Sequence, residues 1–303
     1  MNIKELQYFK VVCEQKSITK AASVLYMTPQ GLSKVMKNIE AQLEASLLIR
    51  TGAGVQLTES GKYLYERLPE LLESYQSICS EIRCIEQRQN HEIDLLSAYG
   101  ILRLVTPECI AQFKGEHPDI RFQYREYPDQ EVVRRLVSGE GNVAFTVGDW
   151  EAKYLNSTFM ERFQIKLLVY RGHPLSQRKS VTIQDLKGEP LYIESSEFHV
   201  QRLIVDRCRA AGFEPNIVFE TSGFSLCHKM VSKKKGISVT VDFIFDDMKD
   251  ENLVMIPFSD GEYCWDTYML TRNGNTDNPD IQIFHDHVSK GISKVKKNPG
   301  LRG

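Results

Sequence analysis

The chain has 303 residues, of which 42% are hydrophobic and 26% charged, with a formal net charge of −2. This composition is that of a soluble globular protein, and no apolar run approaches the roughly 20 residues of a membrane-spanning helix. The N-terminus lacks a signal segment, so we expect a cytoplasmic protein that does not engage membranes. The length predicts two or three compact units.

Seven cysteines are dispersed along the chain and never spaced as CxxC. In a reducing compartment this pattern predicts free thiols, with no metal site and no cofactor. A redox pair formed by Cys208 and Cys227 is the alternative.

Residues 17–34 predict a short helix, a tight turn and the start of a second helix. Thr19 is the expected N-cap of the first helix, and Thr28 followed by Pro29 is typical of the start of the second. The second helix has an apolar face at spacings of three and four, formed by Leu32, Val35, Ile39 and Leu43. Its other face is polar and consists of Gln30, Ser33, Lys34, Lys37 and Asn38.

Small polar side chains near a helix N-terminus are what a DNA major groove accepts. The alternative is a three-helix core with an ordinary solvated face. Residues 1–67 hold nine Lys or Arg and six Asp or Glu, a formal charge of +3. Because this charge is modest, DNA affinity would need two copies of the segment and specific base contacts.

Two β-favouring runs, 47–50 and 55–57, flank a Gly-containing turn and predict a hairpin. After a helix-turn-helix such a hairpin is a wing, and Arg50 is its expected phosphate or minor-groove contact.

Thr58 is the expected cap of a long helix. Its apolar residues keep an alternating spacing of four and three over three heptads, which is typical of a helix that pairs with another helix; they are Leu64, Leu68, Leu71, Tyr75, Ile78, Ile82 and Ile85. Pro69 predicts a kink. A helix docked on its own domain is the alternative, but its apolar stripe would be broader.

Residues 1–67 resemble the winged helix-turn-helix of LysR-type transcriptional regulators. The matching segments are Leu6-Gln7-Tyr8-Phe9, Ser17-Ile18-Thr19-Lys20-Ala21-Ala22, Leu32-Ser33-Lys34, Ile39-Glu40, Leu47-Leu48-Ile49-Arg50 and Leu57-Thr58-Glu59-Ser60-Gly61. The resemblance implies a DNA-binding homodimer, often assembled to a homotetramer, with an effector domain behind the linker helix. RNA polymerase is a further partner of such regulators.

The chain departs from the family pattern at three positions. It has Pro29-Gln30 where Gln-Pro is usual, Ala45 where glycine is common, and Lys34 where arginine is usual. A lysine does not form the bidentate fork of arginine on a guanine. The DNA-binding residues expected by position are Thr28, Pro29, Gln30, Ser33, Lys34, Lys37 and Arg50.

From about residue 91 the chain alternates between strands and helices. The expected strands are 93–97, 120–124, 143–147, 165–170, 191–193 and 217–219, and the expected helices include 101–113, 132–136 and 200–211. This alternation predicts a parallel α/β sheet covered on both faces and divided into two lobes.

This half resembles the family's effector domain, which is built like a two-lobed periplasmic solute-binding protein. The matching marks are His117-Pro118, residues 139–145, His173-Pro174-Leu175 and Gly236-Ile237-Ser238, with Asn142 where aspartate is usual. Ligands of such folds bind at the carboxyl ends of the strands. The effector-binding residues expected there are Ser97, Ala98, Tyr99, Pro128, Thr146, Val147, Ser195, Ser196 and Thr221, with Ser222 beside them.

These residues give opposing indications about the charge of the ligand. Hydroxyls and helix starts suit a carboxylate or another small anion. The nearby Glu194, Glu197 and Glu220 argue against a strongly anionic ligand.

Enzymatic motifs are incomplete. Gly223-Phe224-Ser225-Leu226 begins like a nucleophile elbow but continues with Cys227, and the glycines at 139 and 141 precede their strand instead of following it. The basic tail from Lys290 to Arg302 is expected to be solvated, with DNA contact as the alternative.

We therefore expect a sequence-specific transcriptional regulator, not an enzyme, whose DNA-bound state responds to a small-molecule effector. Its expected parts are a DNA-binding domain (1–58), a linker helix (59–90) and an effector domain (91–303), with one lobe at about 91–162 and 264–303 and the other at 163–263. The competing hypothesis is a cytosolic sensor or carrier whose helical N-terminus makes only protein contacts.

Overall fold

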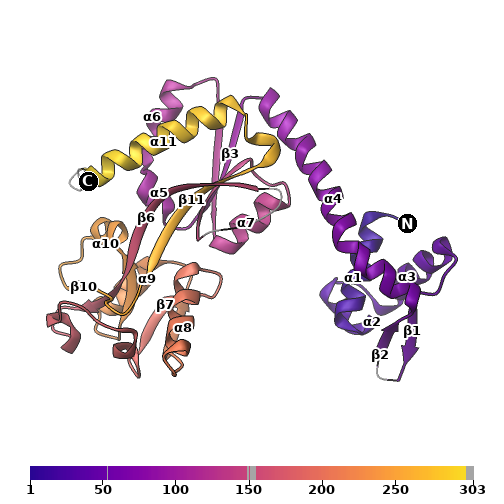
Figure 1. The fold of residues 1–303 in the computed structure, drawn as a ribbon, viewed down its shortest axis with the longest axis horizontal. Coiled ribbons are helices and arrows are strands. Elements are labelled where there is room, and N and C mark those ends of the chain that lie inside the picture. The colour runs from indigo at the N-terminus through magenta and orange to yellow at the C-terminus, as the bar shows by residue number, and fades with distance from the viewer. Residues whose placement is uncertain (53, 149, 151–154, 298–303) are drawn as a thin grey trace. The chain divides into compact units, whose positions relative to one another are not determined.

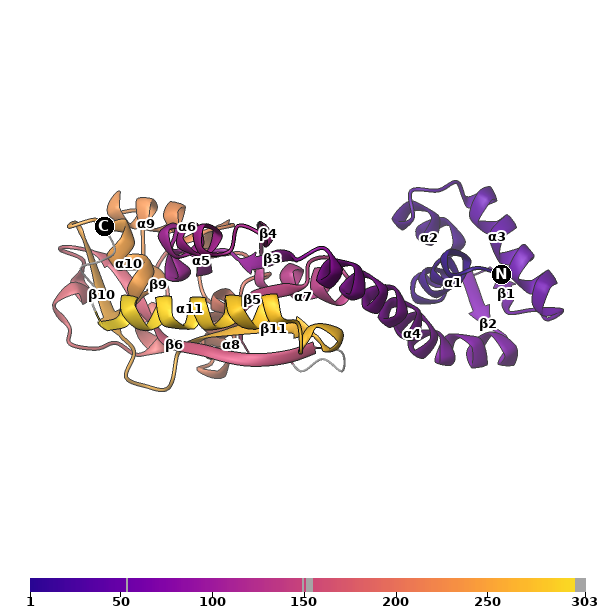
Figure 2. The ribbon, with the colours of Figure 1, turned by 90° about the horizontal axis from the view of Figure 1, so that it is seen from above.

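The computed structural model describes residues 1–52, 54–148, 150 and 155–297. The contacts divide the chain into two compact units, Met1–Cys79 and Ser80–Gly303. The boundary falls inside one long helix, α4 (Glu59–Gln89), which is seen end to end in Figures 1 and 2. Within the described part of the chain, no helix combines the length and apolar character needed to cross a membrane.

The first unit is a three-helix core with a hairpin. It contains α1 (Ile3–Gln15), α2 (Ile18–Val24), α3 (Pro29–Leu43), β1 (Leu48–Thr51) and β2 (Gly54–Leu57). The hairpin is antiparallel, with Arg50 opposite Val55. Its buried core consists of Leu6, Phe9, Val12, Ala21, Ala22, Leu32, Met36, Ile39, Leu47 and Leu68. The predicted helix-turn-helix and hairpin are confirmed.

Local capping sets where these helices begin. Thr28 caps α3 as expected, since its Oγ1 accepts the Gly31 N–H at 3.1 Å and Pro29 follows at the first helical position. The expected cap at Thr19 is wrong, because the Ser17 side chain accepts the Lys20 N–H and starts α2 earlier.

The inward face of α3 also differs in part from the prediction. Leu32 and Ile39 are buried as expected, but Met36 is the third buried residue, Val35 is half-buried and Leu43 is 40% exposed. Positions 32, 36 and 39 lie on one helical stripe, and the last turn extends past the core.

Close backbone contacts join the hairpin to its flanking helices. The Glu40 carboxylate accepts the N–H groups of Leu47 and Leu48 at 2.8 and 3.1 Å, which fixes the entry to β1. A Cβ at Gly61 would overlap the Leu47 carbonyl oxygen, so α4 approaches this strand in a way that only glycine allows. Gly61 and Glu40, which belong to the motifs shared with the family, therefore have structural roles: they hold the hairpin against its flanking helices.

The start of α4 belongs to the first core. Leu68 is fully buried there and Leu64 packs against it, whereas the five later apolar residues of the heptad pattern are exposed. Leu68 and Leu64 thus pack within the core of their own unit, which the heptad pattern alone did not predict. The helix is continuous through Pro69.

The second unit is built on a mixed sheet with the strand order β10-β6-β11-β5-β3-β4, and β9 also pairs with β6. Its strands are β3 (Glu92–Ala98), β4 (Arg121–Tyr127), β5 (Val143–Val147), β6 (Leu155–Tyr170), β9 (Ser238–Val241), β10 (Leu253–Pro257) and β11 (Cys264–Arg272). A separate parallel pair is formed by β7 (Leu191–Glu194) and β8 (Ile217–Thr221).

The expected purely parallel sheet is wrong. Strands β3, β4 and β5 are parallel, but β6 is antiparallel to β9, β10 and β11. The reason is that β6 runs through two groups of strands: residues 155–164 pair with β11, and residues 165–170 pair with β9 and β10. We call β3, β4 and β5 with their helices the first lobe, and β7 to β10 with theirs the second lobe.

The helices of the first lobe are α5 (Ile101–Val105), α6 (Pro107–Glu116), α7 (Asp129–Val137) and α11 (Pro279–Lys297). Those of the second lobe are α8 (His199–Ala210), α9 (Phe224–Ser232) and α10 (Asp242–Met248), and three short 3-10 turns cover Pro174–Gln177, Ile183–Leu186 and Asn273–Asn275. In Figure 2, α11 lies across the sheet next to α5 and α6. Of the basic tail from Lys290 to Arg302, residues 298–302 lie outside the described residues.

The expected single helix at 101–113 is wrong. Thr106 has φ +61° and ψ 143°, which breaks the chain into α5 and α6, and its side chain caps α6. The cause is Pro107, since a proline disfavours the helical conformation of the residue before it.

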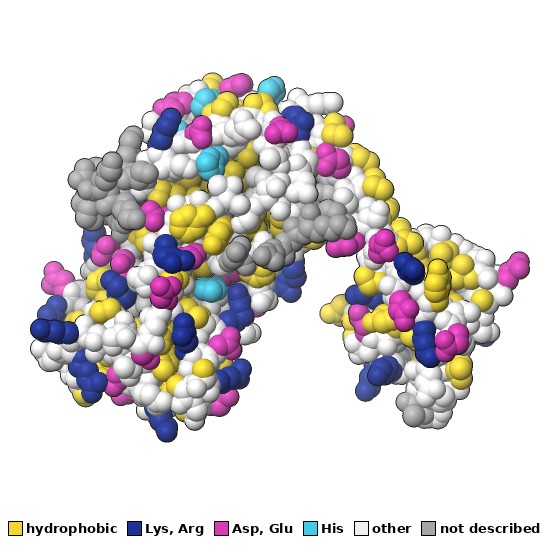
Figure 3. Space-filling model, viewed as in Figure 1, with side chains coloured by type: hydrophobic (Ala, Val, Ile, Leu, Met, Phe, Trp, Pro, Cys, Tyr) yellow, Lys and Arg dark blue, Asp and Glu magenta, His cyan; other side chains and the backbone are white. Residues whose placement is uncertain are grey.

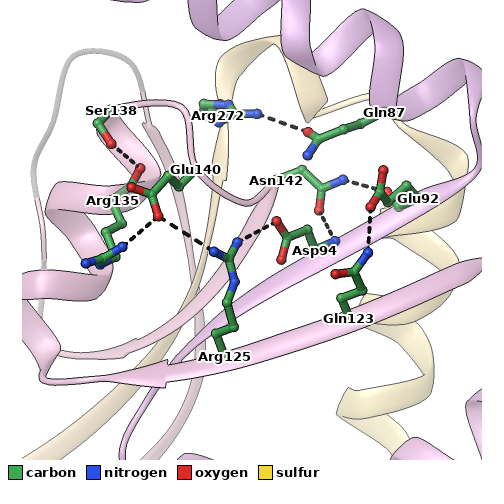
Figure 4. A network of polar contacts seen from close by, with 10 residues as sticks. All are labelled: Gln87, Glu92, Asp94, Gln123, Arg125, Arg135, Ser138, Glu140, Asn142 and Arg272. Atoms are coloured by element: carbon green, nitrogen blue, oxygen red, sulfur yellow. Dashed lines mark hydrogen bonds and ion pairs between the residues drawn. The ribbon is translucent and has the colours of Figure 1, made fainter.

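Asn142, just before β5, ties the start of that strand to the parallel strand β3 (Figure 4). Its Nδ2 donates to the Glu92 carbonyl oxygen at 2.6 Å, and its Oδ1 accepts the Asp94 N–H at 2.9 Å. Next to it, Arg125 bridges the carboxylates of Asp94 and Glu140. A buried carboxamide supplies both a donor and an acceptor, which explains why asparagine fits here where aspartate is usual.

We predict that Asn142→Asp lowers the free energy of unfolding by about 1–3 kcal/mol, because a carboxylate leaves the Glu92 carbonyl without its donor and is itself buried. Urea unfolding of the full chain measures this change. Asn216→Asp, the same change at an exposed loop position, serves as the control. Equal stability of Asn142→Asp and the wild type would contradict the proposed bridging role.

Candidate functional site

The first unit carries a concave surface between its helices and its hairpin. It encloses about 490 Å³. The residues that line it are Ile18, Thr19, Pro29, Gln30, Ser33, Lys34, Lys37 and Arg50. We call this the recognition surface. It gathers six of the seven DNA-binding residues expected from the sequence, and the seventh, Thr28, caps the helix that presents them.

The hairpin contributes to this surface through one specific contact. The Arg50 guanidinium on β1 donates a hydrogen bond to the Ser33 hydroxyl on α3 at 2.5 Å. This contact places a cation of the wing beside the exposed Lys34 and Lys37 of the helix. The lining residues thus include three cations, together with Pro29 and Gln30 from the first turn of α3, where the helix dipole is positive.

Ile18 and Thr19, at the start of α2, line the surface but were not among the predicted contacts. The signal that could have found them is Ser17, which caps α2 and orients its first turn toward the same concavity. An exposed helix N-terminus with small polar side chains, flanked by cations, can bind a polyanion and hydrogen-bond to base edges.

The exposed face of α4 is the second feature. Leu71, Tyr75, Ile78, Ile82 and Ile85 are 42–58% exposed, and apolar side chains follow α4 in Figure 3. In the first unit this face borders a groove lined by Ile3, Arg67, Glu70, Leu71, Ser74, Tyr75 and Ile78. A row of large apolar side chains at heptad spacing on an exposed helix face is suited to pairing with another helix.

The second unit has a hollow between its lobes. It encloses about 630 Å³ and is lined by Tyr99, Gly100, Leu102, Arg103, Thr106, Pro107, Glu108, Tyr124, Glu126, Ser222, Gly223, Phe224, Ser225 and Asp247. We call it the inter-lobe hollow. Its size falls in the range of small-molecule sites, about 300–1,000 Å³.

The structure brings only part of the expected effector set to this hollow. Tyr99 lines it, together with Ser222 next to Thr221. Four others, Ser97, Ala98, Thr146 and Val147, are fully buried in β3 and β5. Pro128 precedes α7 and Ser195 precedes α8, while Ser196 lines a different hollow of the second lobe beside Arg202 and Glu220.

Residues next to the expected ones make the contacts between the lobes. The Asp129 carboxylate, at the start of α7, accepts the His199 backbone N–H at the start of α8 at 2.6 Å. Arg134 of α7 pairs with Glu197 at 3.3 Å, and the rings of Tyr99 and Phe198 lie 6.1 Å apart. Asp129 directly follows Pro128, so a wider window around each strand end would have included it.

Several titratable groups at this boundary have shifted pKa values. Burial raises the pKa of Asp129 to about 6, although the His199 N–H and the Arg202 guanidinium act against this. Burial also raises the pKa of Glu194 well above its usual range, and the Asp129 carboxylate adds to this shift. Burial lowers the pKa of His199, and it lowers that of His228 to about 4.

No metal site accompanies these groups: the described residues contain no cluster of three or more His, Cys, Asp or Glu side chains arranged to hold an ion. None of the seven cysteines, all of which lie in the described part of the chain, forms a disulfide, and Cys208 and Cys227 are both buried.

Comparison with known proteins gives matches over both units. Residues 3–62 match the family model "Bacterial regulatory helix-turn-helix protein, lysR family", and residues 87–292 match the model "LysR substrate binding domain". Among curated proteins, the uncharacterized HTH-type transcriptional regulator YwbI of Bacillus subtilis (strain 168) is 28% identical over 298 residues, covering 98% of this chain and 99% of its own. The regulator BenM of Acinetobacter baylyi is 25% identical over 281 residues, covering 90% of each.

Solved structures show the same fold. Full-length BenM superposes with a TM-score of 0.57 at 22% identity, covering 99% of this chain and 98% of that one. Full-length CbnR, solved in complex with its target DNA, gives a TM-score of 0.53 at 18% identity, covering 96% and 100%.

Proposed function

Because the chain belongs to the LysR family of helix-turn-helix transcriptional regulators, we propose that it regulates transcription by binding DNA through its recognition surface. In this proposal, α3 enters the major groove, with Gln30, Ser33 and Lys34 facing the bases. Arg50 and Lys37 neutralise phosphates on either side. The competing hypothesis of a carrier with no DNA contact is not favoured by membership of this family.

The observation that supports the proposal most directly is the Arg50–Ser33 hydrogen bond. It joins a hairpin cation to the exposed face of α3, although the two residues are 17 positions apart in the chain. A solvated helix face with no binding role has no need for a cation fixed above it by a neighbouring strand.

We further propose that two chains pair through the exposed face of α4, from Leu71 to Ile85. A charge of +3 over residues 1–67 is weak for one copy, and pairing doubles it and matches a two-fold symmetric DNA site. Leu64 and Leu68 contribute indirectly, since they anchor the start of α4 to the first core. Assembly of two such dimers into a tetramer is part of the same proposal.

The inter-lobe hollow is the proposed effector site. Its walls come from both lobes. A bound molecule therefore favours the relative arrangement of the lobes that it fits best and shifts the protein toward that arrangement. In this way a small ligand alters the DNA-bound state without a chemical reaction.

We predict that Lys34→Ala weakens binding to the cognate DNA by about 1–3 kcal/mol, because it removes an exposed cation from the recognition surface. Fluorescence anisotropy at fixed salt measures the affinity. Lys10→Ala removes the same charge from α1, where Lys10 pairs with Glu14 at 2.8 Å outside that surface, and should bind like the wild type. If both variants weaken binding equally, Lys34 acts only through the net charge of the unit.

We predict that Ile78→Lys dissociates the dimer, because it places a cation on a proposed apolar seam where Ile78 is 58% exposed in the single chain. Sedimentation velocity measures the mass of the particle. Gln76→Lys adds the same charge to an exposed position off the seam and should leave the mass unchanged. An intact dimer of Ile78→Lys would refute pairing through this face.

A further inference from the structure

The inter-lobe hollow has an acidic wall. Three carboxylates line it, Glu108, Glu126 and Asp247, against one cation, Arg103. That cation is already paired, since Arg103 donates a hydrogen bond to Asp247. The formal balance of the lining groups is therefore negative, and the Arg103 charge is partly neutralised before any ligand enters.

Glu126 is the best-placed carboxylate. It lies near the carboxyl end of β4, is half-buried, and accepts a hydrogen bond from the backbone N–H of Gly100, which also lines the hollow. Burial raises the pKa of Glu126, although the Gly100 N–H and Arg103 act against this. Its carboxylate is fixed in place and partly desolvated, conditions in which a charge-assisted hydrogen bond gains strength.

The hollow also has aromatic walls. Tyr99 and Tyr124 come from the first lobe and Phe224 from the second. Tyr99 is further held by the neighbouring Phe198 ring. Aromatic faces combined with a carboxylate form the usual environment of an organic cation, because the ring faces carry negative potential.

A second, independent observation is an unpartnered carboxyl oxygen at the lobe boundary. The Glu194 side chain, at the end of β7, is 2% exposed, and its Oε1 has no hydrogen-bond partner in the described structure. It lies close enough to Asp129, in the other lobe, for that carboxylate to raise its pKa. The buried interior of the lobe boundary thus offers unused acceptor capacity, in keeping with the acidic wall of the hollow.

Two helix starts and one histidine at the lobe boundary that could attract an anion are engaged or neutral. The N-terminus of α8 is capped by Asp129 through the His199 N–H, and the first turn of α7 carries Asp129 and Glu131. Since burial lowers the pKa of His199, its ring is neutral near pH 7. These contacts occupy the starts of α7 and α8. The start of α9 lines the hollow at Gly223 to Ser225 without a side-chain cap, and benzoate is therefore the probe for anion binding there.

We propose that the inter-lobe hollow binds a small organic cation, a primary ammonium or guanidinium group on an apolar skeleton, with Glu126 as the acceptor of its charge. This inference rests on the proposed function only in taking the hollow as the effector site. The ammonium sits between the Glu126 carboxylate and the aromatic side chains, and the apolar skeleton contacts Leu102 and Phe224.

Matched probes test this inference. Benzylammonium and benzoate share one skeleton and differ in the sign of their charge, and agmatine adds a guanidinium. Each is titrated into the full-length protein without DNA and followed by isothermal calorimetry and thermal shift. We expect the two cations to bind and to raise Tm, and benzoate to do neither.

The Glu126→Gln variant then locates the charge. Glutamine still accepts the Gly100 N–H, so the fold is kept while the negative charge is lost, and we expect cation binding to weaken about tenfold or more. Glu251→Gln makes the same change at an exposed position outside the hollow and should bind like the wild type. Binding of benzoate in place of the cations, no binding of either cation, or cation binding unchanged in Glu126→Gln would each overturn the proposal.

DNA binding of the same preparations separates this test from that of the proposed function. A protein that binds the cations but no DNA contradicts the regulator proposal and leaves the ligand class standing. A protein that binds DNA but neither cation contradicts the ligand class alone.

Discussion

The continuity of β6 is the constraint on which the effector unit depends. One strand pairs with β11 over its first ten residues and with β9 and β10 over the rest. Because a strand cannot bend freely without losing its ladder, both lobes are built on one hydrogen-bonded frame. The lobe contacts follow from this frame: Asp129 reaches the start of α8, and the hollow opens between Tyr99 and Phe224. A ligand bound there, as proposed, would touch residues of both lobes.

In the first unit, function depends on a few fixed polar contacts rather than on bulk charge. Thr28 fixes the start of α3, the Glu40 carboxylate fixes the entry to β1, and the Arg50–Ser33 bond joins the two elements. Because the backbone of both elements and the Arg50 side chain are already ordered, they lose little further entropy on binding, so a modest charge can still support specific contacts. In the proposed dimer, pairing through the exposed face of α4 doubles this surface.

The first unit was largely predictable from sequence because its signals are local. Thr28-Pro29 and the Gly-containing turn of the hairpin act through neighbouring residues, and the structure places the start of α3 and the strand pairing as expected. Prediction failed where tertiary packing decides: Met36 replaces Leu43 in the core, and Leu68 is buried in its own unit. The regular spacing of apolar residues along a helix does not show which part of that apolar face is buried in the core.

The effector site was less predictable, since its parts meet only in three dimensions. The strand ends were identified, but Ser97 and Thr146 point into the packed interior, while Glu126, Arg103 and Tyr124 complete the hollow from elements that carry no local signal. The antiparallel course of β6 was missed for the same reason, because strand direction depends on long-range pairing.

Selection of a binding sequence from a random DNA duplex pool, followed by a salt titration with a scrambled control, tests the central claim most directly. The account predicts one enriched sequence with two-fold symmetry. Its affinity should exceed that of the control. The logarithm of its association constant should fall linearly with the logarithm of the salt concentration, at a slope of about 0.9 for each neutralised phosphate. The absence of any enriched sequence, with no DNA binding even at low salt, would contradict the account.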